Sequence, residues 1–258
     1  MQAIVTGANP IPVLSFDTID STNAEARRRA EGGEAGPLWI TAAVQTAGRG
    51  RRGRAWDTQR GNLAATLLLT TDKPPAEAAQ LSFVAAFAIR DLASAYAPES
   101  LIRFKWPNDV LVDGRKLSGI LIESGRAPSG ALWLGIGIGV NLAHAPDNLE
   151  RPATALIDHL RADVGAAPTA DEALAILSAA FVRYADVWLS GGFGPLRDQW
   201  LKGAAGIGQS CEVRLDRDTL TGVVEGMDGD GALLLRGADG TLKRIAAGDV
   251  FFASERAA

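Results

Sequence analysis

Apolar residues recur every three or four positions in several segments of the chain, a spacing that places them on one face of a helix. Thr22 and Thr169 each precede such a segment and are followed three residues later by a glutamate. This arrangement is typical of the capping box that starts a helix. The pattern predicts helices over residues 24–30, 75–96, 154–160 and 171–189.

Short runs rich in apolar and β-branched residues, bounded by glycine, proline or asparagine, predict strands between these helices. The pair Asp113-Gly114 joins two of the runs as a two-residue hairpin. Strands and helices together predict an α+β domain built on a mixed sheet. The strands are expected over residues 38–45, 62–70, 101–106, 109–112, 116–123 and 131–142.

The pattern changes after a glycine-rich spacer at residues 203–208. Short strands separated by glycine-containing turns follow it, and about fifty residues of this kind predict a small β-barrel. We therefore expect a larger domain over residues 1–205 and a barrel over residues 206–258. The strands of the barrel are expected over residues 209–215, 220–225, 232–236 and 242–246.

Composition narrows the classes of function. The 258 residues include 26 basic and 30 acidic side chains, so the chain lacks the overall positive charge that non-specific nucleic-acid binding requires. Cys211 is the only cysteine, which excludes an intrachain disulfide and a cysteine-based metal site. The N-terminus lacks a secretory signal pattern, and the longest apolar run, residues 131–143, is too short to span a bilayer. We expect a cytoplasmic protein without a membrane segment or a metal-binding cluster.

Positive charge is concentrated in residues 48–56, which read Gly-Arg-Gly-Arg-Arg-Gly-Arg-Ala-Trp. The three glycines disfavour both helix and strand, and no carboxylate neutralises the four arginines within the segment. Planar guanidinium groups on a flexible backbone suit an anionic ligand such as a phosphate. Taken alone, the segment leaves two other interpretations open, namely an Arg/Gly contact to nucleic acid and a solvated loop.

Two further segments place polar side chains beside predicted strands. In the sequence Lys-Trp-Pro-Asn-Asp at residues 105–109, Pro107 has no N–H to donate and ends a strand. The side chains of Asn108 and Asp109 are then presented in the connection, although a plain strand-ending turn is the alternative. Lys116 opens an otherwise apolar strand directly after a tight hairpin, which restricts where its ammonium group points. A solvated lysine is the alternative at that position.

Glycine alternates with apolar residues in Gly-Ile-Gly-Ile-Gly-Val-Asn at residues 135–141. Alternate residues of a strand share a face, so the glycines leave one face without side chains while the apolar residues enter the core. A strand surface of this kind is typical of a place where a flat ligand or another backbone lies close. Close packing of a helix is the alternative explanation.

Together with Asp20-Ser21-Thr22-Asn23 and Gln45, these segments resemble the biotin protein ligase family. The resemblance covers essentially the whole chain, and five motifs in register are very specific. The family has a small SH3-like C-terminal barrel, in agreement with the pattern after residue 206. Some members carry an N-terminal helix-turn-helix, but Ser-Thr-Asn begins at residue 21 here, so we expect the monofunctional type without a DNA-binding domain. The motifs are Ser-Thr-Asn, Gln-x-x-Gly-Arg-Gly-Arg-x-Gly-Arg-x-Trp, Lys-Trp-Pro-Asn-Asp, Arg-Lys-Leu-x-Gly-Ile-Leu-x-Glu and Gly-Ile-Gly-x-Asn.

The resemblance implies an ATP-dependent ligase that acts in two steps. Biotin is first adenylated to biotinyl-5′-AMP with release of pyrophosphate, and the biotinyl group is then transferred to a specific lysine of a biotin carboxyl carrier protein. Mg²⁺ is implied on the triphosphate. The carrier domain of acetyl-CoA carboxylase or of a related carboxylase is the implied partner, with neither DNA nor a membrane as a partner. The pattern does not decide between a monomer and a dimer.

The resemblance also assigns residues to these steps. Lys116, Arg49 and Arg51 are the implied catalytic residues, with Lys116 between the biotin carboxylate and the α-phosphate. The implied biotin-binding residues are Ser21, Thr22, Asn23, Gln45, Gly48, Arg49, Gly50, Arg51, Lys116, Gly119, Gly137 and Gly139. The implied ATP-binding residues are Arg51, Arg54, Trp56, Lys105, Asn108, Lys116 and Asn141.

Two other functions fit parts of the sequence. Lipoate–protein ligases share the fold and the adenylation chemistry, but they typically carry an Arg-Arg pair followed by a triple-glycine run that is absent here. A non-enzymatic Arg/Gly nucleic-acid-binding module is the second alternative, and the net charge of −4 argues against it.

Overall fold

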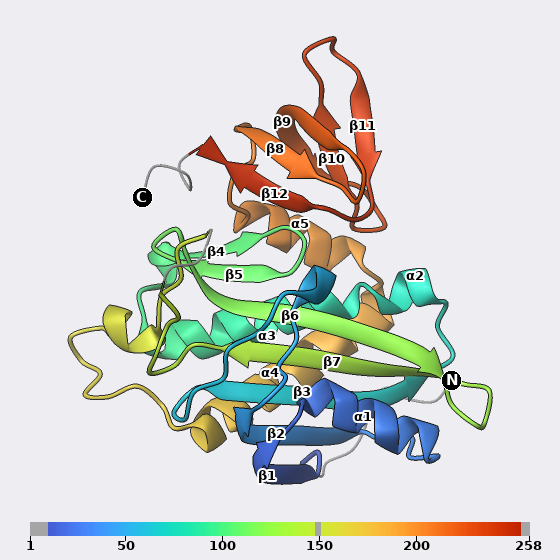
Figure 1. The fold of residues 1–258 in the computed structure, drawn as a ribbon. Helices are drawn as coiled ribbons and strands as arrows, with labels where there is room; N and C mark the ends of the chain where they lie inside the picture. Colours follow the sequence, from blue (N-terminus) through green and yellow to red (C-terminus); the bar gives the residue numbers. More distant parts are fainter. Residues whose placement is uncertain (1–9, 148–150, 254–258) are drawn as a thin grey trace.

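The computed structural model describes residues 10–147 and 151–253, and within them seven strands form one mixed sheet (Figure 1). The strand order is β1-β2-β3-β7-β6-β5-β4, with β1 and β2 parallel and the other neighbouring pairs antiparallel. The predicted hairpin at Asp113-Gly114 is confirmed, since both residues have positive φ, at 50° and 72°. The strands are β1 Val13–Ile19, β2 Leu38–Gln45, β3 Leu63–Thr71, β4 Ile102–Lys105, β5 Asp109–Val112, β6 Arg115–Arg126 and β7 Leu132–Val140.

Helices cover both faces of this sheet. Helices α3 and α4 pack against each other behind it, whereas α1 crosses the front face over β2, β3 and β7 (Figure 1). α4 is the single helix of the described ranges that is long and apolar enough to cross a membrane, and its buried face packs into the core beside α3. The helices are α1 Thr22–Glu31, α2 Pro75–Ala78, α3 Leu81–Tyr96, α4 Ala170–Gly191 and α5 Gly194–Lys202, with 3₁₀ turns at Arg51–Gly53, Glu99–Leu101 and Leu156–His159.

Strand β7 sorts its residues by size between the two faces. Ile136 and Ile138 are buried in the main core with α3 and α4, as the alternation predicts. The glycines face α1, but this face is not bare: a Cβ placed on Gly135 would lie 3.5 Å from the Cβ of Ala26, and one on Gly137 would lie 2.2 Å from Asn23 Oδ1. The predicted empty floor is therefore partly filled by α1, because glycine allows that helix to approach the sheet closely.

A second sheet of five antiparallel strands follows α5 and lies above β4 and β5 (Figure 1). It makes the small C-terminal unit that the turn-rich pattern predicts, and the α+β fold class is confirmed. Trp106 ties it to the first sheet by donating an indole hydrogen bond to the carbonyl of Gly231 at 3.0 Å. The strands are β8 Ser210–Arg214, β9 Thr219–Met227, β10 Leu233–Arg236, β11 Leu242–Ile245 and β12 Asp249–Phe252.

Several boundaries differ from the sequence prediction. The N-cap of α1 is Ser21 rather than Thr22, because the Ser21 hydroxyl accepts the hydrogen bond from the N–H of Ala24. The expected helix over 75–96 is interrupted after Ala78 and continues as α3, and the segment near 154–160 forms only a 3₁₀ turn. The pattern gave no signal for the edge strand β1, for α5 or for the four-residue strand β12.

The close approach of Asn23 to Gly137 leads to a test of stability. The Asn23 amide donates to Glu123 Oε2 at 2.8 Å and accepts from the Thr66 hydroxyl at 2.6 Å, so it cannot move without breaking both hydrogen bonds. We expect Gly137→Ala to lower the free energy of unfolding by about 1–3 kcal/mol in urea denaturation. Gly165→Ala is the control, since nothing lies within 4 Å of its added Cβ. Equal stability of the two variants would contradict this packing.

Candidate active site

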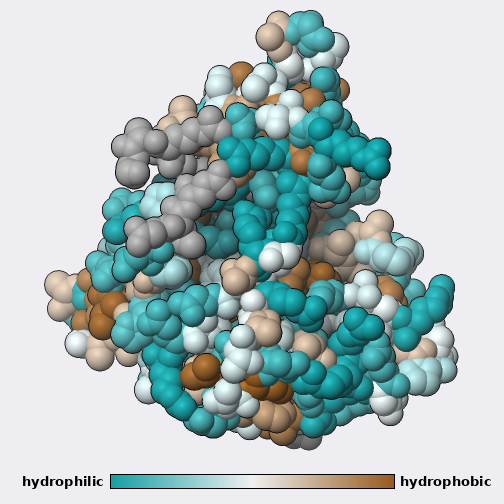
Figure 2. All heavy atoms as spheres, in the orientation of Figure 1, coloured by the Kyte–Doolittle hydropathy of each residue, from teal (hydrophilic) through white to brown (hydrophobic). Residues whose placement is uncertain are grey.

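A cavity of about 430 Å³ lies between the front face of the sheet and the arginine-rich loop at residues 48–56. Hydrophilic residues dominate the molecular face around it, below the second sheet (Figure 2). Of the residues expected at the site, only Gly48 and Lys105 do not line the cavity. The expected residues that line it are Ser21, Thr22, Asn23, Gln45, Arg49, Gly50, Arg51, Arg54, Trp56, Asn108, Lys116, Gly119, Gly137, Gly139 and Asn141.

Lys105 and Gly48 have other surroundings. The side chain of Lys105 is buried, and its Nζ lies 5.6 Å from the ring centroid of Phe252 in β12. Gly48 is needed by the loop backbone, because a Cβ there would lie 2.3 Å from the carbonyl oxygen of Trp56. In the structure, Lys105 therefore contacts the C-terminal unit, and Gly48 shapes the loop.

One end of the cavity is a hydrogen-bonded polar cluster at the start of α1. Gln45 Oε1 accepts from the Thr22 N–H at 2.8 Å and from the Thr22 hydroxyl at 3.1 Å. Gln45 Nε2 donates to the Thr58 hydroxyl at 2.9 Å, and the hydroxyl oxygen of Thr66 lies 2.8 Å from Thr22 Oγ1. These bonds fix donors and acceptors before any ligand arrives, which suits recognition of a small polar group.

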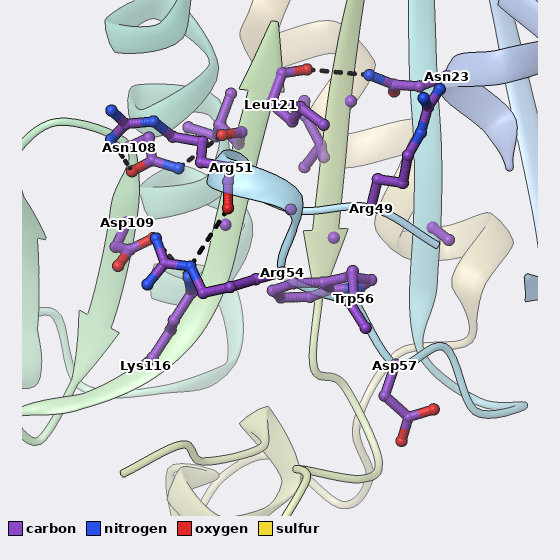
Figure 3. A pocket seen from close by; sticks show the side chains of 18 of the residues that line it. Asn23, Arg49, Arg51, Arg54, Trp56, Asp57, Asn108, Asp109, Lys116 and Leu121 are labelled. Carbon is purple, nitrogen blue, oxygen red and sulfur yellow. Dashed lines mark hydrogen bonds and ion pairs between the residues drawn. The ribbon is translucent and has the colours of Figure 1, made fainter. Parts of the chain in front are cut away.

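The floor of the cavity carries an aromatic side chain. The indole of Trp56 lies on β7 and β6: a Cβ on Gly139 would be 2.2 Å from Trp56 Cε2, and a Cβ on Gly119 would be 3.1 Å from Trp56 Cζ3. Lys116 Nζ lies 5.6 Å from the centroid of the same ring (Figure 3). The glycines thus receive a flat group, as the pattern indicates, but in this structure the group belongs to the protein.

Lys116 points into the cavity from the start of β6 (Figure 3). Its backbone is held on both sides, since its N–H donates to the carbonyl of Pro152 at 2.9 Å and its carbonyl accepts from Thr154 at 3.0 Å. Its Nζ forms an ion pair of 2.7 Å with Oδ1 of Asp109, a buried carboxylate at the start of β5. The ammonium is therefore positioned by a fixed backbone and a buried counter-charge.

The arginine loop folds back on itself and is joined to the second sheet by ion pairs. The N–H of Gly50 donates to the Arg54 carbonyl at 2.7 Å, which closes the loop. Arg54 Nη2 lies 3.0 Å from both carboxylate oxygens of Asp249 in β12, and Arg51 Nη1 donates to Asn108 Oδ1 at 3.2 Å. Arg52 Nη1 lies 3.4 Å from Asp249 Oδ2. Asp249 is therefore the common counter-ion of Arg51, Arg52 and Arg54.

Burial and ion pairing shift the pKa of the Asp249 carboxyl group in opposite directions. Burial raises the pKa of its carboxyl group, but the positive charges of Arg54, Arg151 and Arg51 outweigh it, so the pKa is below its ordinary value. Burial lowers the pKa of Arg51. The carboxylate of Asp249 is consequently ionised at neutral pH and occupies a position among guanidinium groups that an anionic ligand could also take.

The cavity has an excess of two positive charges, from five cationic and three anionic lining residues. Within the described ranges, no group of three or more His, Cys, Asp or Glu side chains could hold a metal ion. The buried carboxylates Asp109 and Asp249 are already engaged by cations. The charge excess favours an anionic ligand. The cations are Arg49, Arg51, Arg54, Lys116 and Arg151, and the anions are Asp57, Asp109 and Asp249.

Two of these charged residues lie outside every motif in the sequence. Asp249 is 195 residues from Arg54, and Arg151 lies in a segment without a recognisable pattern. Both reach the cavity only through the fold. The motif residues, in contrast, could be found because each lies beside a turn or an alternating strand.

The sequence profile of the Biotin/lipoate A/B protein ligase family matches residues 15–141, and that of the Biotin protein ligase C terminal domain matches residues 206–253. The chain is 44% identical to the biotin–[acetyl-CoA-carboxylase] ligase of Paracoccus denitrificans, over 90% of this chain and 97% of the relative. It is 33% identical to the bifunctional ligase/repressor BirA of Bacillus spizizenii, over 91% of this chain and 72% of the relative.

Solved structures share the fold. The biotin protein ligase of Aquifex aeolicus, in complex with biotin and ATP, superimposes with a TM-score of 0.75 at 24% identity, covering 93% of this chain and 97% of that one. The biotin protein ligase of Leishmania major in complex with biotin gives a TM-score of 0.63 at 25% identity, covering 93% of this chain and 100% of that one.

The ion pairs between Asp249 and the arginine loop predict that stability depends on pH. Because its pKa is lowered in the folded protein, its ion pairs stabilise the fold above the unfolded-state pKa of about 3.9 and are lost as the pH falls through the folded-state value. We expect Asp249→Asn to reduce the free energy of unfolding by about 1–3 kcal/mol at pH 7, because its arginine partners are partly exposed. The difference from the wild type should shrink below about pH 4.

Urea denaturation between pH 3 and pH 8 measures this difference. Asp216→Asn is the matched control, because Asp216 pairs with Arg52 of the same loop at 2.9 Å but is 90% exposed. Exposed pairs contribute little, so we expect almost no change in that variant. An Asp249→Asn effect that is as small as the control, or that is no smaller at pH 3 than at pH 7, would contradict these ion pairs.

Proposed function

The chain belongs to the biotin protein ligase family, and we propose that it adenylates biotin with ATP and transfers the biotinyl group to one lysine of a biotin carboxyl carrier protein. It is a ligase, and biotin and ATP are its substrates. The observation that carries the proposal is the convergence of Lys116, the arginine loop and the polar end of α1 on one cavity with excess positive charge.

Charge is the main obstacle to the first step. The biotin carboxylate must attack the α-phosphorus of ATP, and two unit charges at ~4 Å repel by about 4 kcal/mol at an effective dielectric constant of 20. We assign Lys116 Nζ to the position between the two anions, where it stabilises the negative charge that develops as the phosphorus is attacked. A compact ammonium group suits this bridging position.

The arginines would hold the nucleotide and close the loop over it. Arg51 and Arg54 carry planar donor groups at the mouth of the cavity, and Asp249 now occupies them. A phosphate can replace a carboxylate in a bidentate contact with a guanidinium group. Arg49 contacts Glu123 at 3.4 Å on the opposite side of the cavity, where it would face biotin.

Biotin would enter between the polar cluster and the glycine strands. Ser21, Thr22 and Gln45 offer hydrogen bonds to the polar groups of biotin, and the floor at Gly119 and Gly139, which Trp56 covers, would offer a flat surface. Asn23 is held by buried hydrogen bonds, whereas Trp56 belongs to the loop. We therefore expect Trp56 to move off Gly139 and to stack on the adenine.

Mg²⁺ would accompany the triphosphate rather than occupy a protein cage. Within the described residues no three-ligand cluster exists, and Mg²⁺ is typically bound through phosphates, waters and one or two carboxylates. Asp57 is a cavity carboxylate available for such a role, and Asp109 would become available once Lys116 moves to the ligands. The ion would neutralise part of the charge of the triphosphate.

The acceptor follows from the relatives. The ligase of Paracoccus denitrificans is named for acetyl-CoA carboxylase, whose biotin carrier domain is our proposed acceptor. We propose that the reaction takes place in the cytoplasm and that residues 206–258 act as a unit with the catalytic residues 1–205.

Exchange of pyrophosphate into ATP tests the function directly. Labelled pyrophosphate should enter ATP only when biotin is present, because the adenylation step must be reversible for exchange to occur. Lipoate in place of biotin should give no exchange. The protein with neither biotin nor lipoate should also give none. Exchange with lipoate alone would assign the chain to lipoate ligation, and no exchange with either acid would contradict both.

Lys116→Ala should impair adenylation far more than biotin binding. Its ammonium stabilises charge that grows in the transition state, so its loss affects turnover rather than ground-state affinity. We expect single-turnover formation of biotinyl-AMP to fall by about 100-fold or more. Calorimetric affinity for biotin should change only a few-fold. Lys73→Ala, which removes an exposed lysine paired with Glu77, is the control. Unchanged turnover in Lys116→Ala would remove this lysine from the mechanism.

A further inference from the structure

Arg151 lines the cavity although no motif contains it. Its segment runs beside the start of β6, where Lys116 donates to the carbonyl of Pro152 and accepts from the N–H of Thr154. These backbone bonds fix Arg151 next to the residue assigned to the α-phosphate. Its side chain is only 14% exposed.

The guanidinium group of Arg151 is buried, and some of its N–H groups have no acceptor among the described residues. Among the described residues, its Nε and Nη2 have no hydrogen-bond partner, and its Nη1 lies 3.7 Å from Asp109 Oδ2, too far for a hydrogen bond. Its central carbon lies 3.9 Å from the ring centroid of Phe251 in β12. A buried cation with unused N–H groups is costly unless an acceptor completes it.

The position of Arg151 relative to Lys116 narrows the choice of acceptor. The two cations contact opposite oxygens of the Asp109 carboxylate, Lys116 at 2.7 Å from Oδ1 and Arg151 at 3.7 Å from Oδ2. A ligand group bound to Arg151 would therefore lie next to the ligand group bound to Lys116. Arg151 also lies on the side of Phe251, beneath the second sheet, whereas the polar cluster at Thr22 and Gln45 is built on α1 and β2.

We propose that Arg151 is a nucleotide-binding residue that holds the β- and γ-phosphates of ATP, the part that leaves as pyrophosphate. The inference rests on the proposed adenylation function. A carboxylate oxygen of biotin forms a bond to the α-phosphorus, and the bond from the α-phosphorus to the bridging oxygen of the β-phosphate breaks, with its electron pair remaining on pyrophosphate. The two free donors Nε and Nη2 lie on one edge of a planar group, which fits two phosphate oxygens, and the ring of Phe251 orients this group from one face.

Substitutions of Arg151 test whether it binds the β- and γ-phosphates through its charge and its planar donor group. Arg151→Gln removes the charge and the fork, and Arg151→Lys keeps the charge without the fork. We expect the KM values for ATP and for pyrophosphate in the exchange reaction to rise by about 10- to 100-fold in Arg151→Gln. The rise should be smaller in Arg151→Lys. Affinity for purified biotinyl-5′-AMP, which has no β- or γ-phosphate, should stay within about twofold.

Arg214→Gln is the matched control. Arg214 also stacks on Phe251, with its central carbon 3.9 Å from the ring centroid, but it does not line the cavity. This variant should keep the wild-type KM for ATP. Urea denaturation of all three variants identifies any that do not fold, and the lysine variant then stands in for the glutamine variant.

The proposal is overturned if Arg151→Gln leaves both KM values unchanged, or if its affinity for biotinyl-5′-AMP falls as much as that for ATP. Calorimetric binding of inorganic pyrophosphate to the wild type and to Arg151→Gln provides a readout that needs no activity. A wild type that binds pyrophosphate more tightly than the variant, yet shows no biotin-dependent exchange, would retain the phosphate site and contradict the proposed function instead.

Discussion

Positive charge in the cavity exceeds negative charge, and two buried carboxylates from different parts of the chain hold it in place. Asp109 of the first sheet pairs with Lys116, and Asp249 of the second sheet pairs with the arginine loop. Cations that lack such partners would repel one another and would lose hydration at a cost. The carboxylates therefore position the cations before a ligand arrives, and the phosphates of a nucleotide can replace them, so that less ordering is needed on binding.

The sheet supplies the rigid base for this charge. Strand β7 sends Ile136 and Ile138 into the core and leaves glycines on the cavity side, so that α1 and the loop both approach the same surface. The second sheet adds Asp249 and Phe251 from β12. The cavity consequently depends on the contact between both sheets, and the C-terminal unit forms part of the site rather than a separate appendage.

The sequence predicted those features that depend on local chemistry. The strand bounds of Leu38–Gln45 and Asp109–Val112 agree with the pattern, and the motifs identified Lys116 and most of the cavity residues. It could not predict Asp249 or Arg151, since their contacts join segments far apart in the chain. A pattern of glycines shows where side chains are missing but not what covers the gap, and a motif position does not give the direction of a side chain such as Lys105.

The central claim is that ligand phosphates replace carboxylates at preformed cations. The most direct measurement is a crystal structure with biotin and a non-hydrolysable ATP analogue. We predict that Lys116 Nζ leaves Asp109, from which it is now 2.7 Å away, for the space between the biotin carboxylate and the α-phosphate, and that Trp56 leaves Gly139. A complex in which both ligands bind while the Lys116–Asp109 and Arg54–Asp249 pairs stay intact would contradict it.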